Sequence, residues 1–207
     1  MIIINENQID IIKEIINIGV GKAANLLNQL VNKRIKLSVP DINFVTISEL
    51  PEFLKDLKNS DISSIVLNFK GEFSGSCQLL FATEGAKVLV SIFTEDEIID
   101  QDEFNEIKQS TLSEIGNIVL NSLIGTISNV FAQKFIYTPP KYIEDKIQNL
   151  FIKEKNYISQ NVLLATTRFE MQDTNIIGDF LLIFETGSIE ILLEKIEKIN
   201  EEGSLFL

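Results

Sequence analysis

The chain has 207 residues, 45 % of them hydrophobic, and is therefore long enough to bury a substantial apolar core. Its formal net charge of −12 disfavours nucleic-acid binding, which requires clustered lysines and arginines. The sequence contains no histidine, which excludes Ser-His-Asp and Cys-His catalysis, imidazole metal sites and histidine general bases. The single cysteine, Cys77, cannot form an internal disulfide, and we expect it to be a small core residue.

The first half is predicted to begin with a long helix and to continue as strands. Apolar residues recur at helical spacing over residues 6–30, and Asn5 with Gln8 resembles a capping box. Strands are expected at 34–39, ending at Pro40, and at 42–47, followed by a short helix at 52–57. Two more strands at 62–69 and 76–81 flank a glycine-containing turn, and a helix begins at Thr83. Residues 94–103 read as an acidic linker.

The second half repeats this order. A long helix is expected over 103–133, then a short extended run before Pro139 and Pro140, a short helix at 146–155, strands at 161–169 and 176–184, and a final helix at 188–200. The charge-free run 115–133 contains several asparagines and hydroxyl residues, which favours a buried or partner-facing helix over a membrane span. The first residues lack a signal peptide's basic region. We expect a soluble, cytoplasmic protein without membrane insertion.

The repeated order predicts two copies of one α/β unit, approximately residues 1–100 and 101–207. Each copy has too few strands to be stable alone. We therefore expect one domain over residues 1–207 with an α+β fold. In this fold a pseudo-two-fold axis relates the two units, and two long helices pack on a multi-stranded sheet.

Two stretches one hundred residues apart carry the same four positions at the same spacing, [DS]-x3-E-x2-N-x22-P. An α-helix advances about 100° per residue, so the first three positions of each stretch share one helix face. A duplicated fold has no reason to keep a carboxylate and an amide on the wet face of a helix. The repeat therefore predicts a duplicated site, formed by Asp10, Glu14, Asn17 and Pro40 in the first copy and by Ser110, Glu114, Asn117 and Pro140 in the second.

Gly19, Gly21 and Gly116 also lie inside the repeated pattern, although a glycine costs up to about 1 kcal/mol within a helix. Asparagine is likewise a weak helix former, about 0.6 kcal/mol worse than alanine. We therefore expect something to approach these helices closely. Pro40 and Pro140 are expected to shape the loop beside each site and to take no part in the chemistry.

Glu and Asn at this spacing can perform limited chemistry. A carboxamide is too weakly basic to remove a proton from water, but it can orient a water through one accepted and one donated hydrogen bond. Such positioning suffices for phosphoryl hydrolysis, in which catalysis is largely placement and charge stabilisation. The carboxylate could pair with a lysine of a docked protein. The site has no cation, so we expect no metal or cofactor of its own and a partner that supplies both Mg²⁺ and lysine.

The doubled motif and the segment G-V-G-K-A-A-N after Asn17 resemble the CheC branch of the CheC/CheX/FliY family of CheY-P phosphatases. The resemblance implies a chemotaxis phosphatase that hydrolyses the aspartyl-phosphate of a CheY-like response regulator. It implies that Glu14 and Glu114 contact the receiver's lysine, whereas Asn17 and Asn117 enter its active site and orient the attacking water. It also implies a CheD-like receptor deamidase as a possible partner. Two intact motifs favour the CheC branch over CheX members, which keep one.

Two other functions are compatible with the same residues. The chain could be a non-enzymatic adaptor that binds a CheD-like deamidase, a phosphorylated receiver, or both. Alternatively, Asp10, Glu14 and Asn17 could hold Mg²⁺ in a free-standing hydrolase, because all three offer oxygen ligands. The second alternative is weakened by Ser110, which replaces the aspartate in the second copy.

Overall fold

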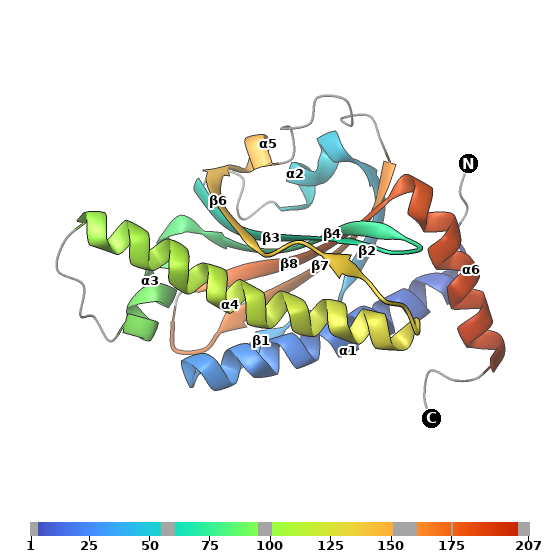
Figure 1. Cartoon of the computed structure of the whole chain (residues 1–207), viewed down its shortest axis with the longest axis horizontal. Coiled ribbons are helices and arrows are strands. Elements are labelled where there is room, and N and C mark those ends of the chain that lie inside the picture. The colour runs from blue at the N-terminus through green and yellow to red at the C-terminus, as the bar shows by residue number, and fades with distance from the viewer. Residues whose placement is uncertain (1–3, 55–60, 95–100, 151–160, 175, 203–207) are drawn as a thin grey trace.

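A single antiparallel sheet takes strands from both halves of the chain (Figure 1). The computed structural model describes residues 4–54, 61–94, 101–150, 161–174 and 176–202. Within these residues the sheet has eight strands: β1 Ile35–Leu37, β2 Asp41–Thr46, β3 Asp61–Lys70, β4 Ser74–Ala82, β5 Ile136–Tyr137, β6 Lys141–Lys146, β7 Asn161–Met171 and β8 Ile177–Glu185.

The two halves exchange their edge strands. The sheet order is β1-β7-β8-β4-β3-β5, with β2 also pairing with β7 and β6 also pairing with β3. On one edge Ile35 of the first half pairs with Met171 of the second, and on the other edge Tyr137 of the second half pairs with Phe69 of the first. In the middle of the sheet, β4 pairs with β8. Each half therefore needs the other to complete its share of the sheet.

Two long helices, α1 (Glu6–Val31) and α4 (Gln101–Val130), lie side by side and antiparallel on one face of the sheet (Figure 1). On the same side, α3 (Thr83–Thr94) packs against α4, and α6 (Thr186–Glu202) packs against α1. The opposite face carries the short helices η1 (Ile47–Glu49), α2 (Leu50–Phe53) and α5 (Ile147–Leu150). The predicted α+β fold, with two long helices on a duplicated sheet, is confirmed.

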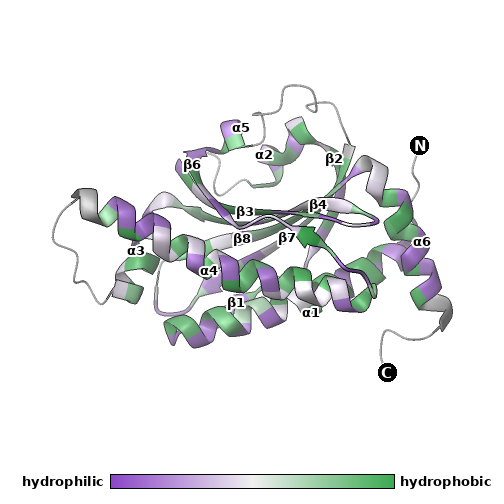
Figure 2. Ribbon diagram, viewed as in Figure 1, coloured by the Kyte–Doolittle hydropathy of each residue, from purple (hydrophilic) through white to green (hydrophobic). Residues whose placement is uncertain are grey.

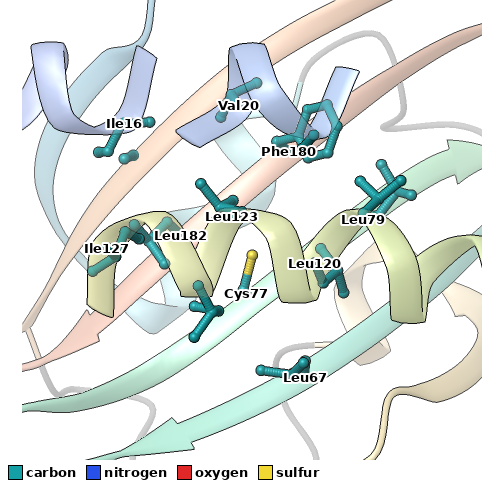
Figure 3. Packing of buried hydrophobic residues seen from close by; sticks show 14 of the residues in the cluster. Ile16, Val20, Leu67, Cys77, Leu79, Leu120, Leu123, Ile127, Phe180 and Leu182 are labelled. Carbon is teal, nitrogen blue, oxygen red and sulfur yellow. The ribbon is translucent and has the colours of Figure 1, made fainter. Parts of the chain in front are cut away.

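The larger apolar core lies between the helix pair and the sheet (Figure 3). Val20 of α1 and Leu123 of α4 meet strand residues such as Leu79 and Leu182 there. Cys77 lies among them, fully buried, and this burial raises the pKa of its thiol. The expectation that this cysteine is a core residue is confirmed. A smaller apolar cluster on the opposite face joins the short helices to the sheet.

The long helices are amphipathic, as the sequence predicts. Figure 2 shows hydrophilic and hydrophobic residues alternating around both of them, which is expected of helices with one buried side. The charge-free run 115–133 accordingly falls mostly in α4, and its buried residues face the core. Across the part of the chain that the structure describes, no helix is long and apolar enough to cross a membrane.

Several element boundaries differ from the expected ones. The helix expected at 52–57 begins earlier, as η1 and α2, and its residues 55–57 lie outside the described residues. The helix expected at 146–155 is α5, with 151–155 outside them, and the acidic linker overlaps the start of α4, with 95–100 outside them. Strand β6 is not predicted from the sequence. Its residues are mostly polar because it forms an edge of the sheet, where side chains meet solvent.

Of Gly19, Gly21 and Gly116, the three glycines expected to mark a close approach, two have an internal explanation. A Cβ on Gly116 would lie 2.2 Å from Cγ2 of Ile65 on β3, and a Cβ on Gly19 would lie 2.5 Å from Cδ1 of Leu123. The close approach expected at these positions is therefore the packing of α4 on the sheet and of α1 on α4, and not an external molecule. Gly21 differs, since a Cβ there would meet nothing within 4 Å.

A polar cluster fixes the first turns of α4 to the edge of the sheet. Lys108, with a side chain only 7 % exposed, donates from Nζ to Oε2 of Glu144 on β6 at 2.7 Å. The Tyr142 hydroxyl donates to the same carboxylate oxygen at 2.6 Å and lies 3.1 Å from Oγ of Ser63 on β3. Burial raises the pKa of Glu144, but the hydrogen bonds from Lys108 and Tyr142 outweigh it and leave that pKa below its usual value.

The two kinds of helix glycine should respond oppositely to alanine. Gly116→Ala forces α4 away from β3, so we expect the free energy of unfolding to fall by about 1–3 kcal/mol. Gly21→Ala adds a methyl group in open space and removes backbone freedom from the unfolded chain. For this variant the free energy of unfolding should rise by about 0.5–1 kcal/mol. Urea denaturation of both variants tests the pair, and equal shifts would contradict the packing argument.

The Lys108–Glu144 pair should make the free energy of unfolding depend on pH in the acidic range. The folded-state pKa of Glu144 is lowered, so its contribution is complete above the unfolded-state pKa of about 4.3 and is lost as the pH falls through the folded value. The difference in unfolding free energy between the parent and Glu144→Gln should therefore shrink as the pH falls below about 4.3. Glu170→Gln is the control, since that exposed glutamate makes no ion pair within the described residues and its substitution removes no such contact.

Candidate functional site

The start of the first helix is fixed before its motif begins. Asn5 caps α1 by accepting from the backbone N–H of Gln8 at 2.8 Å, and its own N–H donates to Oε1 of Gln8 at 3.0 Å. The predicted capping box is thus confirmed. Buried Gln8 also donates from Nε2 to Glu197 on α6 at 2.9 Å. Two separate contacts therefore fix the rotation of α1 about its axis just before the motif begins at Asp10.

The first motif presents its polar groups outward. Asp10 and Asn17 are exposed and Glu14 is half-buried, so the three occupy the wet face that the helical wheel predicts. Within the described residues, none of these three side chains forms a hydrogen bond or an ion pair. Their carboxylates and amide are therefore available to a second molecule without breaking an internal contact.

The second motif, on α4, also presents its polar side chains outward, but two of them form hydrogen bonds within the helix. Ser110 and Glu114 are exposed, and Asn117 is half-buried. The Ser110 hydroxyl donates to the backbone carbonyl of Ile107 at 3.0 Å. The Asn121 amide donates from Nδ2 to Oδ1 of Asn117 at 2.8 Å, across one helical turn. Unlike Asn17, the amide of Asn117 is therefore held by a neighbour on its own helix.

Asn121 is a costly residue for its position. Its Oδ1 is inaccessible and has no hydrogen-bond partner among the described residues. An unsatisfied buried oxygen costs about 1–3 kcal/mol, whereas one side-chain hydrogen bond returns about 0.5–1.5 kcal/mol. Asparagine adds about 0.6 kcal/mol of unfavourable helix propensity. The matching position of the first copy is Gly21, which provides no donor. The sequence places Asn121 on the same helix face as the motif but does not show its hydrogen bond. The spacing of four residues from Asn117 is the feature of the sequence that is compatible with such a bond.

An open groove lies beside the second motif. It has a volume of about 460 Å³ and runs between the C-terminal ends of α1 and α3 and the first half of α4. Glu114 and Ser110 are part of its lining, and Leu30 is 39 % exposed beside it. The groove is lined by Leu30, Phe93, Ser110, Thr111, Glu114, Ile115 and Ile118. The second motif therefore borders a mostly apolar hollow that a docked protein could contact.

The two prolines occupy equivalent loops. Pro40 lies between β1 and β2 and is buried, and Pro140 lies between β5 and β6 and is half-buried. Helix α1 packs on β1 and β2, and α4 packs on β6, so each proline is in a loop between edge strands that flank its motif helix. That they shape the site stays a prediction, as do the roles of the other motif residues.

The arrangement of ligating side chains bears on the Mg²⁺ alternative. Among the described residues, no group of three or more His, Cys, Asp or Glu side chains is placed to hold a metal ion. The first motif gathers two carboxylates and one amide on one helix face, and the second has a single carboxylate. A helix face of this kind offers ligands from one side only, whereas Mg²⁺ demands near-octahedral coordination.

Comparison with known proteins agrees with the motif. The model of the CheC-like family matches residues 8–44, which contain the whole first motif. The chain is 28 % identical to the CheY-P phosphatase CheC of Bacillus subtilis over 129 residues, 61 % of this chain and 61 % of that protein. The match thus spans about three fifths of the length of this curated relative.

Solved structures share the fold at lower identity. FliY of Thermotoga maritima matches with a TM-score of 0.72 and 18 % identity, over 96 % of this chain and 99 % of that one. A chain of the CheX-CheY-BeF3-Mg+2 complex of Borrelia burgdorferi matches with a TM-score of 0.56 and 21 % identity, over 81 % of this chain and 96 % of that one. The predicted resemblance to the CheC/CheX/FliY family is confirmed.

Proposed function

We propose that the chain is a phosphatase that hydrolyses the aspartyl-phosphate of a CheY-like response regulator. The observation that carries this proposal is the pair of outward-facing Glu/Asn sets, duplicated on two helices and available to a docking protein. The similarity to a protein named CheY-P phosphatase supports the same reaction. A structure of related fold that contains CheX with CheY and Mg²⁺ supports a CheY-like partner.

The chemistry assigned to each side is complementary. The receiver provides the phosphoryl group, the Mg²⁺ that neutralises its charge, and a lysine; this chain provides no cofactor. Asn17 or Asn117 holds a water in line with the phosphorus–oxygen bond, accepting through Oδ1 and donating through Nδ2. The water oxygen attacks phosphorus, the bond to the aspartyl oxygen breaks, and inorganic phosphate and the free carboxylate are released. A positioned amide suffices because the transition state is loose.

The glutamates are assigned to docking. Glu14 and Glu114 precede Asn17 and Asn117 by three residues. The Cβ atoms of each Glu/Asn pair are therefore about 5–6 Å apart on one helix face. Pairing with the receiver's lysine would fix the angle at which the amide enters the pocket. At the second motif, the apolar groove beside Glu114 adds contact area for the same partner. A CheD-like deamidase is a further candidate partner, for which the family resemblance is the support.

Removing both amides should abolish the catalysed reaction. We expect the double variant Asn17→Ala, Asn117→Ala to lower phosphate release from a phosphorylated CheY-like receiver with Mg²⁺ by roughly 10²-fold or more, to the receiver's own rate. Asn68→Ala is the control, because this exposed asparagine of β3 lies on the sheet side away from the long helices, and it should keep the parent rate. Parent-like hydrolysis by the double variant would exclude this mechanism. Tight binding of the receiver by the parent without faster hydrolysis would indicate the adaptor function instead.

Removing the carboxylates should affect docking more than turnover. We expect Glu14→Gln with Glu114→Gln to raise KM by roughly 5–50-fold, because a charge pair with the receiver is lost, and to weaken the dependence of kcat/KM on salt. Glu170→Gln, an exposed glutamate on β7, is the matched control. Initial rates over a range of receiver concentrations at two ionic strengths separate the effects. An unchanged KM would rule out the docking role.

A further inference from the structure

We infer that Asn121 is a positioning residue that fixes the amide of Asn117, and that the two sites are consequently unequal, with the second turning over faster once a receiver has docked. This inference rests on the proposed phosphatase function and deepens it. Asn121 lies outside the repeated motif, and its bond to Asn117 makes unequal two sites that the motif alone makes equivalent.

The hydrogen bond between the two amides restrains Asn117 without occupying it. Nδ2 of Asn121 donates to Oδ1 of Asn117 at 2.8 Å. A carbonyl oxygen has two lone pairs, so Oδ1 of Asn117 keeps one for a water hydrogen, and both N–H groups of Asn117 stay available. The amide is thus held in one orientation while retaining the acceptor and donor that the water needs.

The first site lacks this restraint. Gly21 stands at the position equivalent to Asn121, and Asn17 is exposed with no hydrogen bond to any described residue. A free asparagine side chain samples about three χ1 wells and about two amide orientations. Only a fraction of these place the amide for reaction, so pre-organisation should favour the second site by roughly three- to tenfold in kcat.

Stability does not account for Asn121. The residue leaves a buried oxygen without a partner among the described residues, in a helix where other side chains would be better formers. A leucine of similar size would fill the same space without that orphaned oxygen. A side chain kept at a net cost to folding, and bonded to the proposed reactive amide, fits a role in positioning that amide.

The loss-of-function test uses a chain in which only the second site works. In the Asn17→Ala background, we expect Asn121→Leu to lower kcat by roughly three- to tenfold and to leave KM within about twofold. Because leucine keeps the volume and removes the orphaned oxygen, the urea midpoint should stay equal or rise. A purely structural role predicts lower stability instead. Retention of the full kcat by Asn121→Leu would overturn the positioning role.

The gain-of-function test transfers the donor to the first site. In the Asn117→Ala background, we expect Gly21→Asn to raise kcat by roughly three- to tenfold, since the new amide can bond Asn17 one turn away. Space exists for it, because a Cβ at residue 21 meets nothing within 4 Å. Gly21→Ala is the matched control: it changes helix propensity in the same direction but provides no donor, so kcat should not rise. An equal effect of both substitutions would overturn the inequality of the sites.

Failure of this inference can be told apart from failure of the proposed function. If the double variant lacking both amides hydrolyses like the parent, the phosphatase mechanism fails. If it is inactive but Asn121→Leu keeps the full kcat, only the present inference fails. A readout without activity is side-chain NMR of Asn117 in the isolated protein. A single χ1 rotamer in the parent that becomes averaged in Asn121→Leu supports the positioning, and an unchanged rotamer distribution overturns it.

Discussion

The pairing of each half's edge strands with the other half is the constraint on which the rest of the molecule depends. Strands β1 and β2 have their ladder partner in β7, and β5 and β6 have theirs in β3. Backbone groups on these strands find their ladder partners only when the halves are joined, and separate halves would expose the unpaired edges of β7 and β3, which are prone to aggregation. The resulting continuous sheet is the platform for both long helices, which therefore lie side by side and not on separate units.

Close contact between helices and sheet then sets the orientation of the two polar faces. Gly116 lets α4 approach Ile65, and Gly19 admits the side chain of Leu123 between the helices. Because these contacts fix the inner face of each helix, the motif side chains, which lie on the opposite face, point away from the core. The buried Lys108 and its partner Glu144 add a polar anchor at the beginning of α4. Packing on one side of each helix thereby controls chemistry on the other.

The sequence predicts most of this fold because the responsible signals are local. The capping pair Asn5 and Gln8, the apolar spacing of both long helices and the alternation of the central strands all act within a few residues. The duplicated motif likewise predicts which face of α1 and α4 is exposed. Strand β6 is not predicted because four of its six residues are charged and it shows little apolar alternation, and the exchange of strands between the halves has no local signature at all.

At the candidate site, the sequence predicts residue types and faces but not contacts. The difference between Asn17 and Asn117 arises from one neighbour four residues away, and its hydrogen bond depends on side-chain rotation that spacing alone does not specify. The close approach expected at Gly19 and Gly116 is present, but the sequence does not say which atoms approach. A glycine in a helix indicates a close approach, but only the packed structure shows whether the approaching atoms belong to the same chain.

The exchange of strands also governs when the protein can fold during synthesis. Ile35 of β1 pairs with Met171, so the first edge of the sheet has no partner until residue 171 has left the ribosome. Pairings between such distant residues carry a large loop-closure entropy and are associated with slow folding. During that interval α1 can form, but its apolar side has no completed sheet to cover. The helix that carries the first site is therefore synthesised well before strand β7, with which the first edge of the sheet pairs.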